Sequence, residues 1–342
     1  MKILVIELSN LGDAILTYPV LQGLWEAYPE AEFHLVAGPY TWALFHGDER
    51  VDRVWIWDKK APVWRQTALI VKLLFQWFDL VVDFRRTLIP FFLVGAKGMP
   101  LFRHSAARSS HKAEQHLALL DSIRVPRPTQ PARLQYGPED EEVVRQWLRP
   151  KAVHPELVEG PVVVMAPGAK SHLKRWAPER FAAVADRLIA EENAQVLLVG
   201  GGEDRPVAEL VLRAMKQPAT DLTGRTTLRQ LAALLAQTQL AITNDSACLH
   251  AAEAMGVPTV AIFGPTDEKK YGPRNPRSAV ARLSLVCAPC ELALCPYNHE
   301  CMTMLQPHDV LSAALKILAS GPGRHSERSE ESRSESLEGK SG

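Results

Sequence analysis

The sequence predicts an α/β fold of two domains, each a parallel sheet wrapped by helices. Strand-like and helix-like segments alternate from the first residues onward, which is typical of βαβ units. The 342 residues exceed the size at which one hydrophobic core usually stops growing. The alternation also starts twice, near Lys2 and near Pro161, with a proline-containing stretch between Gln146 and Gly160. These observations predict a linker between two α/β halves.

In the first half, short β-branched or leucine-rich runs predict strands, and apolar residues at helical spacing predict helices. The expected strands are 2–8, 33–37, 54–57 and 80–84. The expected helices are 13–28, 68–77 and 111–123.

The second half repeats this plan. The expected strands are 161–165, 195–199, 240–242 and 259–263. The expected helices are 178–192, 205–215, 228–237, one that starts near Ala247, and 307–318. We expect the last helix to pack near the domain junction. From Gly321 onward almost no apolar residues remain, which predicts a disordered tail.

The most informative segment, 240–266, reads LAITNDSACLHAAEAMGVPTVAIFGPT. A buried strand is followed by polar residues, among them Asp245 and Ser246, and then by a helix start. Such a start leaves backbone N–H groups unpaired and carries partial positive charge, so it suits a phosphate or diphosphate. The alternative is that Asp245 and Ser246 only cap the helix.

Composition indicates an ordinary globular enzyme, with 46% hydrophobic and 23% charged residues. The formal net charge of +0 gives no global basic field, so nucleic acid is not an expected partner. No apolar run is long enough to span a bilayer, and the start MKILVIELSNLGD does not resemble a signal peptide. The expected compartment is the cytoplasm.

Four of the five cysteines fall in one short segment, with spacings of two, four and five residues; they are Cys287, Cys290, Cys295 and Cys301. One C-x₂-C half suits zinc, but no second matching half follows. Thiols that pack or oxidise reversibly are therefore favoured over a structural zinc site.

The first strand leads into a polar turn, 9–13, that ends in Gly12 and Asp13. Parallel sheets place ligands at the carboxyl ends of their strands, so Asp13 is a candidate functional carboxylate. Its alternative role is to stabilise the helix dipole. No G-x-G-x-x-G motif follows, which weakens a nicotinamide or flavin interpretation.

The first strand of the second half ends in a glycine turn, 166–169, followed by Lys170, His172, Lys174 and Arg175. Lysine and arginine side chains beside such a turn suit an anion, although a solvated basic loop would look similar. This turn, the 200–203 turn and the Asp245 segment each follow a strand of one predicted sheet. We expect the three strand ends to meet at one crevice.

Taken together, these segments resemble glycosyltransferase family 9, the bacterial heptosyltransferases. The resemblance covers roughly residues 1–318, and the matching motifs follow in the family's order. They are LSNLGDAILTYPVLQGLWEAYP, PGAKSHLKRWAPERFAAVADRL, the GGGED turn, the 221–267 stretch that contains TNDSACLH, and the loop CAPCELALCPYNHECM.

The resemblance implies a GT-B fold, in which two Rossmann-like domains with parallel sheets face a central cleft. It implies an acceptor domain over 1–150, a linker over 151–160, a donor domain over 161–320 and a tail over 321–342. It assigns the general base to Asp13 and places Ser9 and Gly12 on the acceptor side. The implied donor-binding residues are Gly168, Lys170, Lys174, Glu203, Asp245, Ser246, Ala247 and His250.

His250 lies four residues after Ser246, on about the same helix face, and its alternative role is that of a packed histidine. Two positions depart from the family. Ala247 stands where a glycine is usual, which tightens backbone access to phosphate. Glu7 stands where an arginine is frequent, near the acceptor side, and Arg85, Arg86, Arg103 and Arg108 are candidates to supply the missing charge.

The function implied is inverting, metal-independent transfer of a heptose from ADP-heptose to a lipopolysaccharide inner-core acceptor, without a cofactor. The implied partners are the donor, a lipid-linked oligosaccharide acceptor and the cytosolic face of the inner membrane, with the protein a monomer. Alternatives are transfer of another nucleotide sugar to another acceptor, or nucleotide or glycan binding without catalysis. A dehydrogenase is the least favoured.

Overall fold

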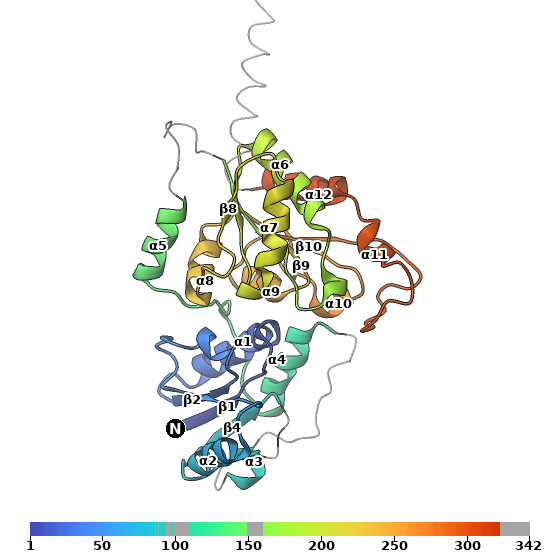
Figure 1. Ribbon diagram of the computed structural model, residues 1–342. Helices are drawn as coiled ribbons and strands as arrows, with labels where there is room; N and C mark the ends of the chain where they lie inside the picture. The colour runs from blue at the N-terminus through green and yellow to red at the C-terminus, as the bar shows by residue number, and fades with distance from the viewer. Residues whose placement is uncertain (86, 88, 94–96, 99–109, 149–159, 322–342) are drawn as a thin grey trace, which may run out of the picture.

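A computed structural model describes residues 1–85, 87, 89–93, 97–98, 110–148 and 160–321. Two α/β units lie one above the other, each built on its own parallel sheet (Figure 1). The first unit holds the sheet of residues 2–98, and the second holds the sheet of residues 162–281. Of the linker predicted over 151–160, only Gly160 belongs to the described residues. Of the tail predicted over 321–342, only Gly321 does.

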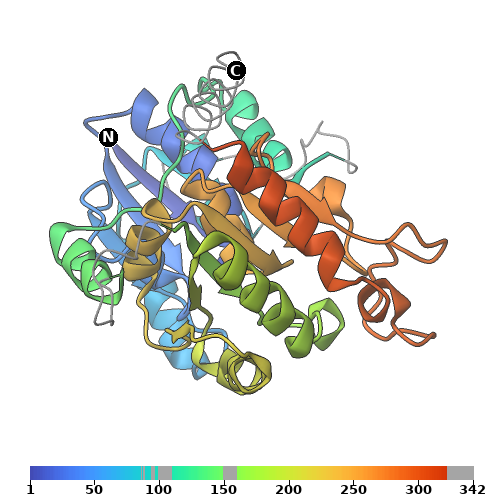
Figure 2. The ribbon, with the colours of Figure 1, turned by 90° about the horizontal axis from the view of Figure 1, so that it is seen from above.

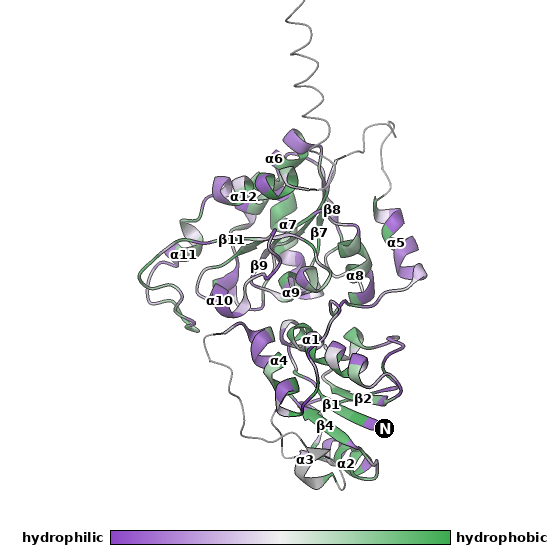
Figure 3. Cartoon of the chain, turned by 180° about the vertical axis from the view of Figure 1, so that it is seen from behind, coloured by the Kyte–Doolittle hydropathy of each residue, from purple (hydrophilic) through white to green (hydrophobic). Residues whose placement is uncertain are grey.

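The first sheet has the strand order β3-β2-β1-β4-β5, and every neighbouring pair is parallel. Its strands are β1 (Lys2–Ile6), β2 (Glu32–Ala37), β3 (Arg53–Ile56), β4 (Leu80–Asp83) and β5 (Lys97–Gly98). Strands β1, β2 and β4 are strongly hydrophobic (Figure 3), as expected for strands covered on both faces.

Alternate residues of β1 face two different cores. Ile3 and Val5 pack on the side of α1 (Leu11–Ala27) and α4 (Lys112–Ser122). Leu4 and Ile6 pack on the other side, toward α2 (Val63–Leu74) and α3 (Ile89–Phe92). Because α1 directly follows β1, its start lies at the carboxyl edge of the sheet, next to the second unit (Figure 1).

The second sheet has the order β11-β10-β9-β6-β7-β8, again parallel throughout. Its strands are β6 (Val162–Ala166), β7 (Gln195–Leu198), β8 (Thr220–Asp221), β9 (Leu240–Asn244), β10 (Thr259–Ile262) and β11 (Ala279–Ala281). Helices α6 (Pro178–Glu192), α7 (Arg205–Ala214) and α12 (Pro307–Ala319) cover one face, and α8 (Leu228–Ala236) and α9 (Ala247–Ala254) cover the other. Short helices complete the unit: η3 (His172–Lys174), η4 (Gly202–Asp204), α10 (Glu268–Tyr271) and α11 (Glu300–Thr303).

The two units are joined by packing as well as by the chain. Helix α1 contacts α9, whereas α5 (Pro138–Leu148) lies beside the second unit and packs against α8 (Figure 1). Arg229 of α8 donates to the Asp140 carboxylate of α5 at 3.0 Å and to the Gly47 carbonyl of the first unit at 2.9 Å. One hydrophobic core therefore continues from the first unit to the α8 and α9 side of the second.

The position predicted for the last helix is wrong. Helix α12 lies side by side with α6 on the sheet face turned away from the first unit (Figure 2). Val310, Ala314 and Ile317 bury their side chains in the core of that face. The apolar side of the helix is buried within its own unit, so α12 does not pack at the junction between the units.

Most predicted elements are present, with ends shifted by a few residues. Helix α2 begins earlier than predicted because Pro62 stands directly before it and fits a helix start, and it ends before Phe75. Helix α5 was not predicted, although Pro138 and the acids 139–141 form a recognisable helix start.

Candidate functional site

The carboxyl ends of three neighbouring strands form the floor of the candidate site. Strands β9, β6 and β7 are adjacent and parallel, so the turns after Asn244, Ala166 and Leu198 emerge at one edge of the sheet. This convergence was predicted from the sequence and is confirmed. The start of α9 lies in the same place, and its first N–H groups supply partial positive charge.

The turn between β9 and α9 is not held by a capping side chain. Ser246 occupies the N-cap with extended backbone but makes no capping hydrogen bond, and its hydroxyl lies 3.1 Å from the Thr243 hydroxyl. The helix-cap interpretation of Asp245 and Ser246 is therefore wrong. The side chain of Asn244 fixes the turn instead, since it donates to the Pro167 carbonyl at 2.7 Å and accepts from the Trp176 N–H at 3.1 Å.

Asp245 pairs with Lys174 across the sheet edge. The Lys174 Nζ donates to Asp245 Oδ2 at 2.6 Å, and the carboxylate is almost fully buried while the lysine is partly exposed. The ammonium also lies 6.0 Å from the ring centroid of Tyr271. Lys174 is thus held at the start of α9 by a buried anion, and among the described residues its Nζ makes no other hydrogen bond, which leaves donors for a ligand.

The start of α1 touches the start of α9. A Cβ at Gly12 would lie 2.9 Å from Cδ2 of His250 and 3.5 Å from Cα of Ala247, so a glycine permits this approach. Asp13 accepts a hydrogen bond from Asn10 Nδ2 at 2.9 Å, and Asn10 Oδ1 accepts one from Lys170 Nζ at 3.0 Å. Asn10 therefore links the two units, a role that its place in a polar turn did not reveal.

His250 is buried, and burial lowers its pKa to about 4, although Asp245 and Asp13 oppose this shift. The imidazole is therefore neutral at physiological pH. Two further residues of this environment were not predicted. His111 Nε2 donates a hydrogen bond to the Gly272 carbonyl at 3.0 Å, and its positive form disfavours the positive form of His250. Burial first, and then Asp13, raise the pKa of Tyr271.

The glycine turns approach Asp204 closely. A Cβ at Gly168 would lie 2.1 Å from the Asp204 carboxyl, so this position requires glycine. Asp204 accepts from the Gly201 N–H at 3.0 Å, and burial raises its pKa. Glu203 is exposed on η4, one residue before Asp204. Among the described residues, the contacts that join Asp13, Lys170, Lys174, Asp245 and His250 do not extend to Glu203.

Glu7 offers no surface to an acceptor, contrary to the expectation from the sequence. Its side chain is 0% exposed, accepts from the Thr17 hydroxyl at 3.0 Å, and has its pKa raised by burial to about 8. Arg85 Nε donates to the Glu7 carbonyl. Within the described part of the chain, Arg85 Nη2 is buried without a hydrogen-bond partner, near Gly38 and Ser9. The candidates Arg86, Arg103 and Arg108 lie outside the described residues.

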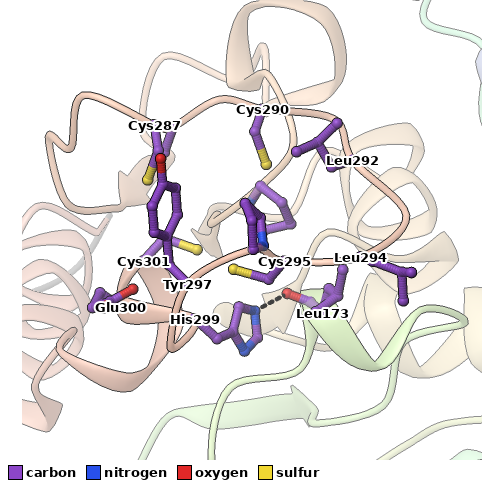
Figure 4. A pocket seen from close by; sticks show the side chains of 13 residues that line it. Leu173, Cys287, Cys290, Leu292, Leu294, Cys295, Tyr297, His299, Glu300 and Cys301 are labelled. Atoms are coloured by element: carbon purple, nitrogen blue, oxygen red, sulfur yellow. Dashed lines mark hydrogen bonds between the residues drawn. The ribbon is translucent and has the colours of Figure 1, made fainter.

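The cysteine loop encloses a cavity of about 210 Å³, and Cys290, Cys295 and Cys301 point toward its middle (Figure 4). All five cysteines are free thiols, and burial followed by its neighbouring cysteines raises the pKa of Cys301. In the described residues, no group of three or more His, Cys, Asp or Glu side chains is arranged to hold a metal ion.

The same loop supports the candidate site. The His299 ring donates a hydrogen bond at 2.6 Å to the carbonyl of Leu173, the residue directly before Lys174. The N–H groups of Cys290 and Glu291 donate to the Pro265 carbonyl at 3.0 and 2.8 Å. The structure therefore gives the loop a positioning contact beside Lys174. Whether zinc also binds stays a prediction, with packed thiols favoured.

Comparisons with known proteins agree with this geometry. The family model of glycosyltransferase family 9 (heptosyltransferase) matches residues 99–300. Lipooligosaccharide heptosyltransferase 2 of Campylobacter jejuni serotype O:6 is 26% identical over 330 residues, which cover 93% of this chain and 99% of that protein. Lipopolysaccharide heptosyltransferase 2 of Escherichia coli K12 is 27% identical over 318 residues, which cover 83% and 88%.

Two solved structures share the fold. The family 9 glycosyltransferase of Veillonella parvula has a TM-score of 0.79 at 22% identity, covering 94% of this chain and 97% of its own. ADP-heptose lipopolysaccharide heptosyltransferase II of Escherichia coli has a TM-score of 0.75 at 23% identity, covering 93% and 98%. The predicted GT-B fold of two Rossmann-like units with parallel sheets is thereby confirmed.

Proposed function

Because this chain belongs to glycosyltransferase family 9, we propose that it transfers a heptose from ADP-heptose to a lipopolysaccharide inner-core acceptor with inversion. The contact between Gly12 and His250 supports this most directly. It brings the Asp13 turn of one unit against the start of α9 in the other, so a carboxylate and a cationic diphosphate site border the same space.

The donor's diphosphate would bind at the start of α9. Lys174 faces that helix start, and the unpaired N–H groups of Ser246 and Ala247 complement phosphate oxygens. Gly168 and Lys170 border the same strand ends, with Asp245 and His250 beneath the sugar and Glu203 toward the ribose or base. In this proposal, 161–320 forms the donor domain.

Transfer would proceed by attack of an acceptor hydroxyl on the anomeric carbon. Asp13 accepts the hydroxyl proton as the new C–O bond forms, and the bond between the anomeric carbon and the diphosphate oxygen breaks. ADP leaves with the bonding electron pair, and Lys174 and the helix start stabilise the charge that develops on it. In this proposal Lys174 and the helix start take the role of a metal ion, and the transfer is metal-independent.

The acceptor would lie on the first unit, in the domain over 1–150, next to Ser9 and Gly12. Arg85, near Ser9, is only partly buried and adds positive charge to this side, which suits an acidic group of that acceptor. The protein would work as a monomer on the cytosolic face of the inner membrane. Among the described residues, no helix is both long and apolar enough to cross a bilayer.

The test is direct transfer. The purified chain is incubated with ADP-heptose and heptose-deficient core acceptors that differ in length, and products are identified by mass spectrometry. One acceptor should gain one heptose with release of ADP. Transfer from a different nucleotide sugar, or donor binding with neither transfer nor hydrolysis, would contradict the proposal.

A further inference from the structure

The outer face of α2 carries large apolar side chains in the open. Phe75 is 80% exposed, Trp77 72% and Trp64 66%, although such residues usually bury most of their surface. Val63, Val71 and Leu74 are exposed beside them. These six residues form a surface that we name the α2 apolar face.

Part of the face lies along one side of the helix. Trp64, Ala68 and Val71 of α2 and Phe75, the residue directly after it, recur at spacings of four, three and four residues. Trp77 follows in the loop after the helix. Leu73, on the opposite side, is fully buried in the core beneath the sheet, where Leu69 also packs. The packing of α2 on the first unit therefore does not use the exposed apolar residues. Their exposure requires another explanation.

Cations predominate in the segment that carries this face, although Asp58 and Asp79 flank it. Between residues 59 and 77 the chain has four cations, Lys59, Lys60, Arg65 and Lys72, and no acid. Arg65 Cζ lies 5.1 Å from the ring centroid of Trp64, so a guanidinium flanks the aromatic face. Asp58 lies just before this segment and accepts from the Lys60 N–H at 2.8 Å.

We propose that the α2 apolar face docks on the surface of an anionic phospholipid bilayer, with Trp64, Phe75 and Trp77 in the interfacial layer and the four cations against lipid phosphates. A helix with exposed aromatic side chains and flanking cations has the properties of an interfacial anchor. A protein partner would have to match this predominantly cationic segment with acidic groups at fixed positions, whereas an anionic bilayer presents negative charge across its whole surface.

The position of the face fits this role. Helix α2 lies at the end of the first unit farthest from the second unit (Figures 1 and 3), so a bilayer there leaves the contact between α1 and α9 uncovered. This inference deepens the proposed function and rests on it for one point only, the lipid nature of the acceptor. Membrane docking itself requires neither donor nor acceptor.

The test is co-sedimentation of the full chain with vesicles of phosphatidylcholine, alone or mixed with phosphatidylglycerol. The chain should bind the anionic vesicles and lose binding as salt rises from about 50 to about 500 mM, because screening weakens the cationic contacts. The combined variant Trp64→Ser, Phe75→Ser, Trp77→Ser should bind at least about tenfold more weakly. Replacing the four cations with glutamine should abolish the preference for anionic lipid.

A matched control replaces three exposed apolar residues of the cysteine loop, Val286→Ser, Leu294→Ser and Tyr297→Ser. This variant should bind vesicles like the unmodified chain, and circular dichroism verifies that all variants are folded. Equal binding of the α2 variant and the unmodified chain would overturn the proposal. So would a dimer in light scattering that the α2 variant dissociates, since the face would then be a subunit interface.

Turnover separates this inference from the proposed function. With a lipid-free core oligosaccharide as acceptor, the α2 variant should keep the activity of the unmodified chain. With the acceptor embedded in vesicles, its activity should fall by about the same factor as its binding. Vesicle binding without any heptose transfer would contradict the proposed function alone, and transfer without vesicle binding would contradict the docking alone.

Discussion

Gly12 and His250 meet where the two units of the molecule touch, and the glycine leaves no space for a side chain. A Cβ at position 12 would lie 2.9 Å from Cδ2 of His250, closer than real carbon contacts allow. Because Asp13 follows Gly12 and His250 belongs to the helix whose start faces Lys174, this contact fixes the distance between the proposed base and the proposed diphosphate site.

Gly12→Ala should therefore impair transfer more than stability. The added methyl group must displace the buried His250 ring or move α1 away from α9. A displacement of about 1 Å at a reacting centre can lower turnover by about a hundredfold. We expect kcat to fall by about ten- to a hundredfold, with ADP affinity changed less, as measured by steady-state kinetics and calorimetry.

Gly23→Ala is the matched control, since its Cβ would lie 2.6 Å from Leu120 Cδ1 inside the first unit. It should lower the melting temperature while the folded enzyme retains its kcat. Full turnover in Gly12→Ala would show that the contact has no catalytic importance.

Asp13→Asn should remove the proton acceptor and preserve the fold, because the amide has the same shape as the carboxyl group. General-base catalysis contributes about 10²- to 10⁴-fold, so kcat should fall by that factor while ADP affinity stays within about twofold. The control is Asp121→Asn on the exposed surface of α4, which should change neither. Retained turnover in Asp13→Asn would exclude Asp13 as the base.

Lys174→Ala should weaken ADP binding by between about ten- and a hundredfold, because it removes a charged donor from the diphosphate. It also leaves the buried Asp245 carboxylate without its 2.6 Å partner, so unfolding must be measured alongside. Lys174→Arg, which keeps the charge, should recover part of the affinity. Lys216→Ala, on the exposed surface of the same unit, is the control. Calorimetry that shows no loss of ADP affinity in Lys174→Ala would exclude Lys174 from the diphosphate site.

The sequence predicted those parts of the site that depend on local pattern. Buried strands such as β9 are recognisable in the sequence by a run of apolar residues. The polar residues after such strands lie at one edge of the sheet because parallel strands share their carboxyl edge. Asp13, Lys174 and Asp245 could therefore be named in advance.

Contacts between distant segments were beyond prediction. Asn10 and Lys170 are 160 residues apart and meet only because the two units pack together. Tyr271 joins the environment of Asp13 through the fold of α10, a four-residue helix without periodicity. Glu7 was expected near the acceptor side, whereas it is buried and Thr17, ten residues later, supplies its hydrogen bond.

Ala247→Gly should raise ADP affinity by about two- to fivefold, since Ala247 stands at the first position of α9 and its methyl group narrows access to the backbone N–H groups. The substitution should also cost about 0.5–1 kcal/mol of stability. Ala254→Gly, at the other end of the same helix, should show the stability cost without the affinity gain. Unchanged affinity in a titration of Ala247→Gly would mean that the family's usual glycine is not needed for donor access here.

Glu7 should make the protein less stable as the solution becomes alkaline. Burial raises its pKa from 4.5 to about 8, so the folded carboxyl group keeps a proton that the unfolded chain has already released. Its contribution to stability is therefore complete below pH 4.5 and is lost as the pH rises through about 8. Between about pH 6.5 and about pH 8.5 this loss amounts to about 2 kcal/mol of unfolding free energy.

Glu7→Gln should abolish that part of the slope, because a glutamine fills the same space and does not titrate. Urea unfolding across this interval measures it, and His250 contributes equally to both proteins, so the difference between their slopes reports Glu7. Glu26→Gln is the control, since Thr129 and Gln22 lower the pKa of Glu26 to about 2 and both states are then ionised throughout. Equal slopes for Glu7→Gln and the unmodified chain would mean that the Glu7 carboxyl group is already ionised in the fold at neutral pH, with Arg85 as its counter-charge.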